Sequence, residues 1–194
     1  AEFSQVDGPD RRSELLLPAY HSVLLACRKH ERQKEAADVL ARMGAAADTA
    51  AYNEVLHLLR LKSDFDGAIQ LWEAMAPGAR DRLGYYHLLD ICGQQGRWQF
   101  ALALLDEMRA QLGDDAPSGG HYLAALRACA KDRRWSEAVA LARSLPAESL
   151  AQDKWLAKTA LAASAEAAAP ELAAMLVDAL GPKAKAEEHA QSLV

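Results

Sequence analysis

The sequence lacks long hydrophobic runs, although 51% of its 194 residues are hydrophobic. No uninterrupted apolar stretch approaches the roughly 20 residues that a membrane span needs, so no span is expected. Aromatic residues make up only 6% of the chain, and Ala and Leu dominate the apolar positions, which favours helix over sheet. The length suits one domain or one short repeat array with a continuous core.

Basic residues are not in excess. The formal net charge is −5, and the segment from Tyr20 to Leu145 holds 16 Lys and Arg against 16 Asp and Glu. A protein that relies on attraction to phosphate usually carries an excess of positive charge, which is absent here. The chain does not begin with Met and shows no recognisable targeting peptide, so we expect a processed chain or a fragment.

Metal-binding and catalytic motifs are also missing. The 3 cysteines and 6 histidines show neither Cys-x₂-Cys nor His-x₃-His spacing, so we expect no metal and no cofactor. There is no phosphate-binding loop and no nucleophile elbow, and an enzyme is therefore not expected. Cys27, Cys92 and Cys129 share one position of a repeat described below, and are predicted to be free, buried core residues.

What the sequence does contain is a repeated phrase. It starts at Tyr20, Tyr52, Tyr85 and Tyr122, at intervals of 32, 33 and 37 residues. Apolar residues recur 3, 4 and 7 positions after each tyrosine, which is one face of an amphipathic helix. Intervals of this size are typical of stacked helix pairs. The longest interval is explained by a flexible Ser118-Gly-Gly linker.

A second apolar face lies 16, 19, 20 and 23 residues after each tyrosine. The residue at the first of these positions is always alanine, which predicts close approach of two helix backbones there. These alanines are Ala36, Ala68, Ala101 and Ala138. Phe65, Trp98 and Trp135 are predicted to anchor the start of the second helix, where the first copy has Gln33.

The sequence therefore predicts an all-α fold, an α-solenoid of antiparallel helix-turn-helix repeats whose first helices form the concave face. A single helix pair cannot bury both of its apolar faces, so neighbouring pairs must stack. About four repeats are expected in residues 14–145, and a degenerate Ala-rich capping repeat in residues 146–182. Residues 1–13 and 183–194 are expected to be flexible.

The capping repeat is predicted from a weaker signal. Trp155 lies 33 residues after Tyr122, which places it in phase with the repeat tyrosines. We expect it to open a helix that runs to about Ala169, with Pro170 in the first turn of a second helix.

The two central copies resemble the pentatricopeptide repeat family. In that family a repeat has Tyr near its start, Ala sixteen residues later, then an apolar pair, and Met at the twenty-third position. The matching residues are Tyr52, Ala68, Leu71, Trp72 and Met75, and Tyr85, Ala101, Leu104, Leu105 and Met108. Asp48 and Asp81 match the linker between repeats. The tetratricopeptide repeat is the nearest alternative, but it pairs its small residues at a different spacing.

The resemblance implies an organellar protein, of chloroplast or mitochondrion, that binds single-stranded RNA and reads one base per repeat. It also implies base-reading positions two residues after each Tyr and three before the next. Carried over, these positions are Ser22 with Thr49, Glu54 with Arg82, and His87 with Gly119. The residue that clamps a base in the family precedes the Tyr, and is Ala19, Ala51, Gly84 and His121 here.

Cations near the ends of the first helices form a strip that could follow a phosphate backbone or an acidic partner. The strip consists of Lys29, Lys62, Arg97, Lys131 and Arg134. We favour the interpretation that these cations complement helix dipoles on a solvated face.

These observations predict a non-enzymatic helical-repeat binding module. The preferred hypothesis is a scaffold subunit that docks protein partners within an organellar assembly, because the array is neutral and lacks aliphatic base clamps. The alternative is single-stranded RNA binding for the processing or translation of organellar transcripts, as the family resemblance implies.

Overall fold

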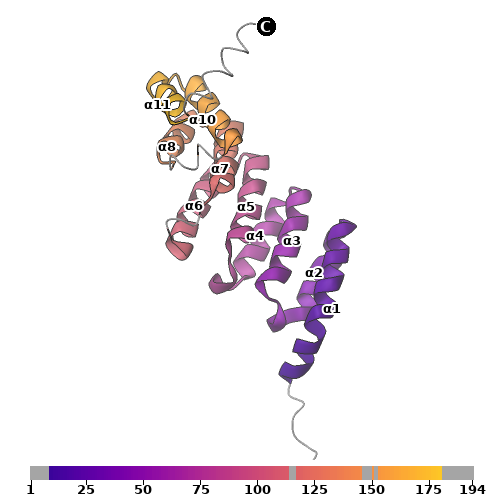
Figure 1. Cartoon of the computed structure of the whole chain (residues 1–194). Helices are drawn as coiled ribbons and strands as arrows, with labels where there is room; N and C mark the ends of the chain where they lie inside the picture. The colour runs from indigo at the N-terminus through magenta and orange to yellow at the C-terminus, as the bar shows by residue number, and fades with distance from the viewer. Residues whose placement is uncertain (1–8, 114–116, 146–149, 151–152, 181–194) are drawn as a thin grey trace, which may run out of the picture. The chain divides into compact units, whose positions relative to one another are not determined.

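The computed structural model describes residues 9–113, 117–145, 150 and 153–180 (Figure 1). All regular secondary structure in these residues is helical, so the predicted all-α class is confirmed. The chain divides into two compact units, residues 1–87 and 88–194.

The first unit is built from two helix pairs. They are α1 (Pro9–Lys29) with α2 (Gln33–Met43), and α3 (Thr49–Leu61) with α4 (Phe65–Ala74). Short 3₁₀ turns follow the second helices, η1 (Gly44–Ala46) and η2 (Pro77–Ala79), and α5 (Arg82–Gln95) begins at the end of this unit. Helix α3 packs against α1, α2 and α4, as a stacked repeat requires.

The second unit contains the remainder of α5 and five further helices among its described residues. They are α6 (Trp98–Leu112), α7 (Gly119–Lys131), α8 (Trp135–Arg143), α10 (Lys154–Glu166) and α11 (Pro170–Leu180). Helix α7 packs against α6, α8 and α10, and α10 packs against α8 and α11.

The predicted repeat register is confirmed at the alanine position of the second helices. Ala36, Ala68, Ala101 and Ala138 are each 0% exposed. Each of the second helices α4, α6 and α8 begins at the predicted aromatic anchor, and α2 begins at Gln33. The methyl side chain lets the second helix lie close to its neighbours, and a larger side chain would have to displace them.

The turn between the two helices has the same backbone geometry in every repeat. The residue 11 positions after the tyrosine has a positive φ, and the residues in question are Glu31, Ser63, Gly96 and Arg133. Only Gly96 adopts this left-handed conformation without steric strain, since it has no Cβ. The recurrence shows that stacking of the helices, rather than the local residue, imposes the turn.

The last helix pair is shifted from the predicted phase by two residues. Trp155 is 68% exposed, and Asp153 caps α10 by accepting hydrogen bonds from the backbone N–H groups of Trp155 and Leu156, both at 3.0 Å. Ala157 is buried, and Ala168, 11 residues later, has the positive φ of the other turns. Ala157 therefore takes the tyrosine position. Trp155 lies in the first turn of α10 and Pro170 opens α11, as predicted, but Trp155 is not in phase with the repeat tyrosines, because the capping residue fixes where the helix begins.

All three cysteines are free and buried, as predicted. Burial raises the pKa of the Cys92 thiol to about 12 and that of Cys129 to about 11. Both thiols are therefore protonated and unreactive at neutral pH.

The predicted terminal segments fall largely outside the described residues. Residues 1–8 and 181–194 are not described, while residues 9–13 belong to α1. The division into repeats at 14–145 and a capping segment at 146–182 stays a prediction.

Candidate functional site

A polar side chain on one first helix contacts the aspartate that caps the next first helix. Asp48 caps α3: its Oδ1 accepts a hydrogen bond from the backbone N–H of Ala51 at 2.9 Å. Its other oxygen, Oδ2, lies 3.1 Å from Nε2 of His21 on α1. One carboxylate thus starts a helix and binds the preceding repeat.

The same arrangement recurs one repeat later. Oδ1 of Asp81 accepts a hydrogen bond from the backbone N–H of Gly84 at 2.8 Å. Nδ2 of Asn53, on α3, donates to both oxygens of Asp81 at 3.1 and 3.0 Å. Asn53 is only 8% exposed, and its Oδ1 is buried without a hydrogen-bond partner among the described residues. The amide is therefore held by one of its two polar ends.

These pairs share one register. His21 and Asn53 each follow the repeat tyrosine by one residue, and Asp48 and Asp81 each precede the next tyrosine by four. The predicted base-reading pairs lie one position further along in both helices. The residues that the structure brings together are therefore the sequence neighbours of the predicted base-reading residues, and not those residues themselves.

The predicted base-reading residues themselves lie in varied settings. Ser22 Oγ donates to the carbonyl oxygen of Pro18 within α1 at 2.9 Å, and Glu54 accepts from Arg28 at 3.1 Å. His87 is 4% exposed, and its ring lies edge-on to His57 with centroids 5.4 Å apart. The other three are the first residues of their helices: Thr49 of α3, Arg82 of α5 and Gly119 of α7.

His57, which is half-buried beside His87, is a neutral group rather than a cation. Burial lowers the pKa of His57, and the guanidinium groups of Arg60 and Arg28 lower it further. Nδ1 of His57 lies 3.4 Å from Nη2 of Arg60. The ring is therefore uncharged at pH 7 and does not attract phosphate.

Most of the predicted basic strip already has partners within the protein. Lys62 forms an ion pair with Glu31, and Lys131 donates to the backbone carbonyl of Gln94. Arg134 lies over the ring of Trp98 at 5.2 Å and pairs with Asp132 at 3.1 Å. Lys29 is the last residue of α1, and Arg97 directly precedes α6. These side chains are exposed enough to meet a ligand, but binding one requires them to leave the partners just described.

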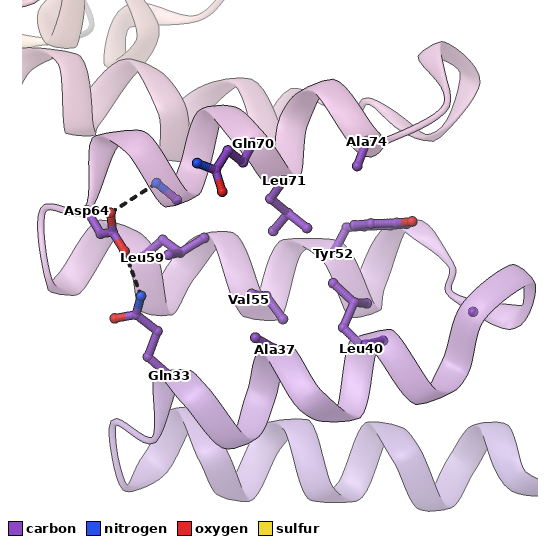
Figure 2. A pocket seen from close by; sticks show the side chains of 13 residues that line it. Gln33, Ala37, Leu40, Tyr52, Val55, Leu59, Asp64, Gln70, Leu71 and Ala74 are labelled. Atoms are coloured by element: carbon purple, nitrogen blue, oxygen red, sulfur yellow. Dashed lines mark hydrogen bonds between the residues drawn. The ribbon is translucent and has the colours of Figure 1, made fainter.

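A second candidate site is a groove between the second helices of the first unit (Figure 2). Helices α2 and α4 form its walls and α3 its floor, and the cavity volume is about 510 Å³. Val55 and Leu59 lie on the floor, facing Ala37 of α2. Gln33 closes one end by donating from Nε2 to Oδ2 of Asp64 at 2.7 Å.

The second unit has a groove at the same repeat positions, between α6 and α8, but its volume is only about 260 Å³. Larger side chains fill it. Leu102, Asp106, Arg109 and Glu137 stand where the first groove has Ala37, Ala41, Gly44 and Gly67. Arg109 lines the groove, pairing with Asp106 on the same helix at 3.0 Å and stacking on Tyr122 of α7 at 5.6 Å. The open volume in the first unit therefore follows from its small residues.

Within the described ranges, no group of His, Cys, Asp or Glu side chains is arranged to hold a metal ion. Among the residues that the structure describes, no helix is long and apolar enough to cross a membrane.

Sequence reasoning does not identify the pairs His21–Asp48 and Asn53–Asp81. Both aspartates match the family's linker in the sequence, and Asp is a strongly preferred N-cap. The signal available in the sequence was a polar residue directly after the tyrosine in the same repeats. What could not be read from it is that the capping carboxylate has a second oxygen aimed at that residue.

Comparison with known proteins gives the following similarities. The family model described as the PPR repeat matches residues 85–111. The pentatricopeptide repeat-containing protein 10, chloroplastic, of Zea mays is 37% identical over 100 residues, which are 50% of this chain and 12% of that protein. The crystal structure of the pentatricopeptide repeat protein PPR10 from maize aligns with a TM-score of 0.47 and 25% identity, over 87% of this chain and 30% of that one. The chain therefore spans less than a third of either protein.

Proposed function

Because residues 85–111 match the PPR repeat model and a pentatricopeptide repeat-containing protein is 37% identical over half of the chain, we propose that this chain binds single-stranded RNA with the polar ends of its first helices. Proteins built from such repeats read one base per repeat with two or three side chains. The observation that carries the proposal is the recurrence of His21–Asp48 and Asn53–Asp81 in one register. In both repeats the capping aspartate holds a polar side chain of the preceding first helix, His21 or Asn53, beside a predicted base-reading position.

The geometry of Asn53 suits a base contact. Asp81 holds Nδ2, while Oδ1 is buried without a partner, and an unsatisfied buried acceptor costs about 1–3 kcal/mol. Rotation of the amide toward the face of α3 would expose Oδ1 to an N–H donor on a base edge. Binding would then satisfy an acceptor that the free protein leaves unpaired.

The affinity is expected to depend weakly on salt. The array from Tyr20 to Leu145 is electrically neutral, and the pairs at the site contribute carboxylates of their own. Few phosphates can therefore be neutralised, and the salt dependence of the binding constant scales with their number. Most of the binding free energy must come from base contacts.

We assign the protein no catalysis of its own, and we place it in an organelle. The name of the maize relative describes that protein as chloroplastic, which supports the chloroplast over the mitochondrion.

Docking of a protein partner is the second candidate. The neutral charge of the array favours it, as does the pairing of Lys62 and Arg134 with nearby carboxylates. The family resemblance makes RNA the stronger candidate of the two.

The test is fluorescence anisotropy with labelled single-stranded RNA of several sequences, at two salt concentrations. Asn53→Ala should weaken binding and relax its sequence preference, whereas Gln99→Ala, an exposed amide on the second helix α6, should change neither. The double variant Lys62→Glu, Lys131→Glu measures the contribution of the basic strip. Binding no tighter than the ~10⁻⁴–10⁻⁶ M typical of non-specific association, or binding unchanged by Asn53→Ala, would reject the proposal and leave protein docking.

A further inference from the structure

One register position is buried in every first helix except α1. It lies three residues after the repeat tyrosine. Val55 in α3 is 3% exposed, Leu88 in α5 is 1% exposed and Ala125 in α7 is 0% exposed. Val23, at the same position of α1, is 45% exposed.

The neighbouring positions behave in the same way. Ala51 and Leu58 of α3 are both 0% exposed, and they lie on the same side of the helix as Val55, which lines the groove walled by α2. Their equivalents in α1 are Ala19 and Ala26, and both are exposed. The face that α3 buries against the preceding repeat is therefore open in α1, as far as the described residues show.

This open face has the spacing of a helix-pairing seam. Leu16, Ala19, Val23 and Ala26 are separated by three, four and three residues, and we refer to them as the outer seam. Such spacing places apolar side chains in one line along a helix and lets a second helix pack against them. Leu16 is 45% exposed, like Val23. The seam spans about 15 Å at a rise of 1.5 Å per residue.

Helix α1 is continuous where the other first helices begin. α3, α5 and α7 each begin three residues before their tyrosine, whereas α1 begins at Pro9, eleven residues before Tyr20. Leu16 occupies the place at which Asp48 and Asp81 cap α3 and α5. The short linker through which one repeat leads into the next is therefore absent at this position of α1.

We propose that the outer seam binds the outer seam of a second copy of this chain, with the two α1 helices antiparallel. The seam is complementary to itself in that arrangement. A twofold axis near His21 sets Leu16 against Ala26 of the second copy, and Ala19 against Val23 of the second copy. Large side chains then meet small ones along the whole seam, as an isologous interface requires. A parallel pairing would instead set Leu16 against Leu16 and leave the alanines facing each other.

The interface is small, so the dimer should be weak. Three helical turns bury less than the roughly 1,200 Å² at the lower limit of stable interfaces. We expect a dissociation constant on the order of micromolar, at which the dimer separates on dilution. The proposal rests on the packing of α1 alone and stands apart from RNA binding.

Sedimentation velocity of the full chain, from ~1 to ~100 µM, tests the dimer at the concentrations that its weak affinity implies. The wild-type protein should shift from monomer to dimer across this range. Val23→Glu should stay monomeric at every concentration, because each interface would bury two carboxylates. Leu25→Glu is the matched control: Leu25 is 46% exposed on the same helix but lies off the seam, and this variant should dimerise like the wild type. A monomeric wild type, or equal behaviour of the two variants, overturns the proposal.

Disulfide cross-linking tests the antiparallel register. A mixture of Ala19→Cys and Val23→Cys chains should form a disulfide between the two variants, whereas neither variant alone should cross-link. The native cysteines are buried, so they contribute little background. Cross-linking of each variant with itself, or of none, contradicts the pairing even if the chain dimerises.

Discussion

Asp81 and Asn53 form a two-pronged contact between successive first helices, with Nδ2 of Asn53 at 3.1 and 3.0 Å from the two carboxylate oxygens. The same carboxylate caps α5 through the backbone N–H of Gly84. A single side chain thus sets where one helix begins and how it is tied to the helix before it. The equivalent contact of Asp48 with His21 shows that the arrangement occurs in two successive repeats.

Asp81→Ala should lower the free energy of unfolding by about 2 kcal/mol, since it removes a helix cap and the partner of a buried amide. Urea denaturation followed by circular dichroism measures this loss. Asp38→Ala, at an exposed position within α2, is the control and should change stability by no more than about 0.5 kcal/mol. Equal effects of the two substitutions would mean that the carboxylate of Asp81 does not connect the repeats.

Ala101→Leu should destabilise the protein by about 1–3 kcal/mol through overpacking. Ala101 is 0% exposed at the close-contact position of α6. Ala103→Leu places the same side chain on the exposed face of that helix and should be nearly neutral. A thermal melt of Ala101→Leu that matches the wild type would contradict the helix register.

Ala37→Leu should stabilise the first unit by about 0.5–1 kcal/mol, because it fills part of the 510 Å³ groove with the side chain that Leu102 supplies in the second unit. The measurement is again the free energy of unfolding in urea. Ala162→Leu, at an exposed position of α10, adds the same apolar group outside any groove and should give no gain. A loss of stability in Ala37→Leu would mean that the groove is not open to a larger side chain.

Stability should fall as the pH drops below the ordinary histidine pKa of 6.5. Burial, with Arg60 and Arg28, lowers the pKa of His57 in the folded protein. The unfolded chain therefore binds a proton at a pH at which the folded protein does not, and protonation favours unfolding. The contribution of His57 is present above pH 6.5 and is lost as the pH falls below it.

Melting temperatures between pH 7.5 and 5 measure this effect, with His57→Gln and His30→Gln compared. His57→Gln should flatten the pH dependence, whereas the exposed His30→Gln should leave the slope of the wild type. A slope that survives His57→Gln would assign the effect to another group.

The sequence by itself determined the repeat and most of the core. The period of the tyrosines, the alanine sixteen residues later and the aromatic anchors specify which faces are apolar, and an apolar helical face has to be buried against another. Ala68 and Ala101 are buried as their positions predict, and the helices begin at Phe65 and Trp98 as expected.

Only the tertiary structure decided which side chains meet between repeats. The pairing of Asn53 with Asp81 depends on the rotation and rise of one first helix relative to the next, and a displacement of one residue turns a side chain by about 100°. For this reason the base-reading positions implied by the family resemblance lie one residue away from the pairs that the structure shows. The tertiary structure also decides the exposure of Val23 and of Trp155. An apolar residue is buried only where another helix packs against it.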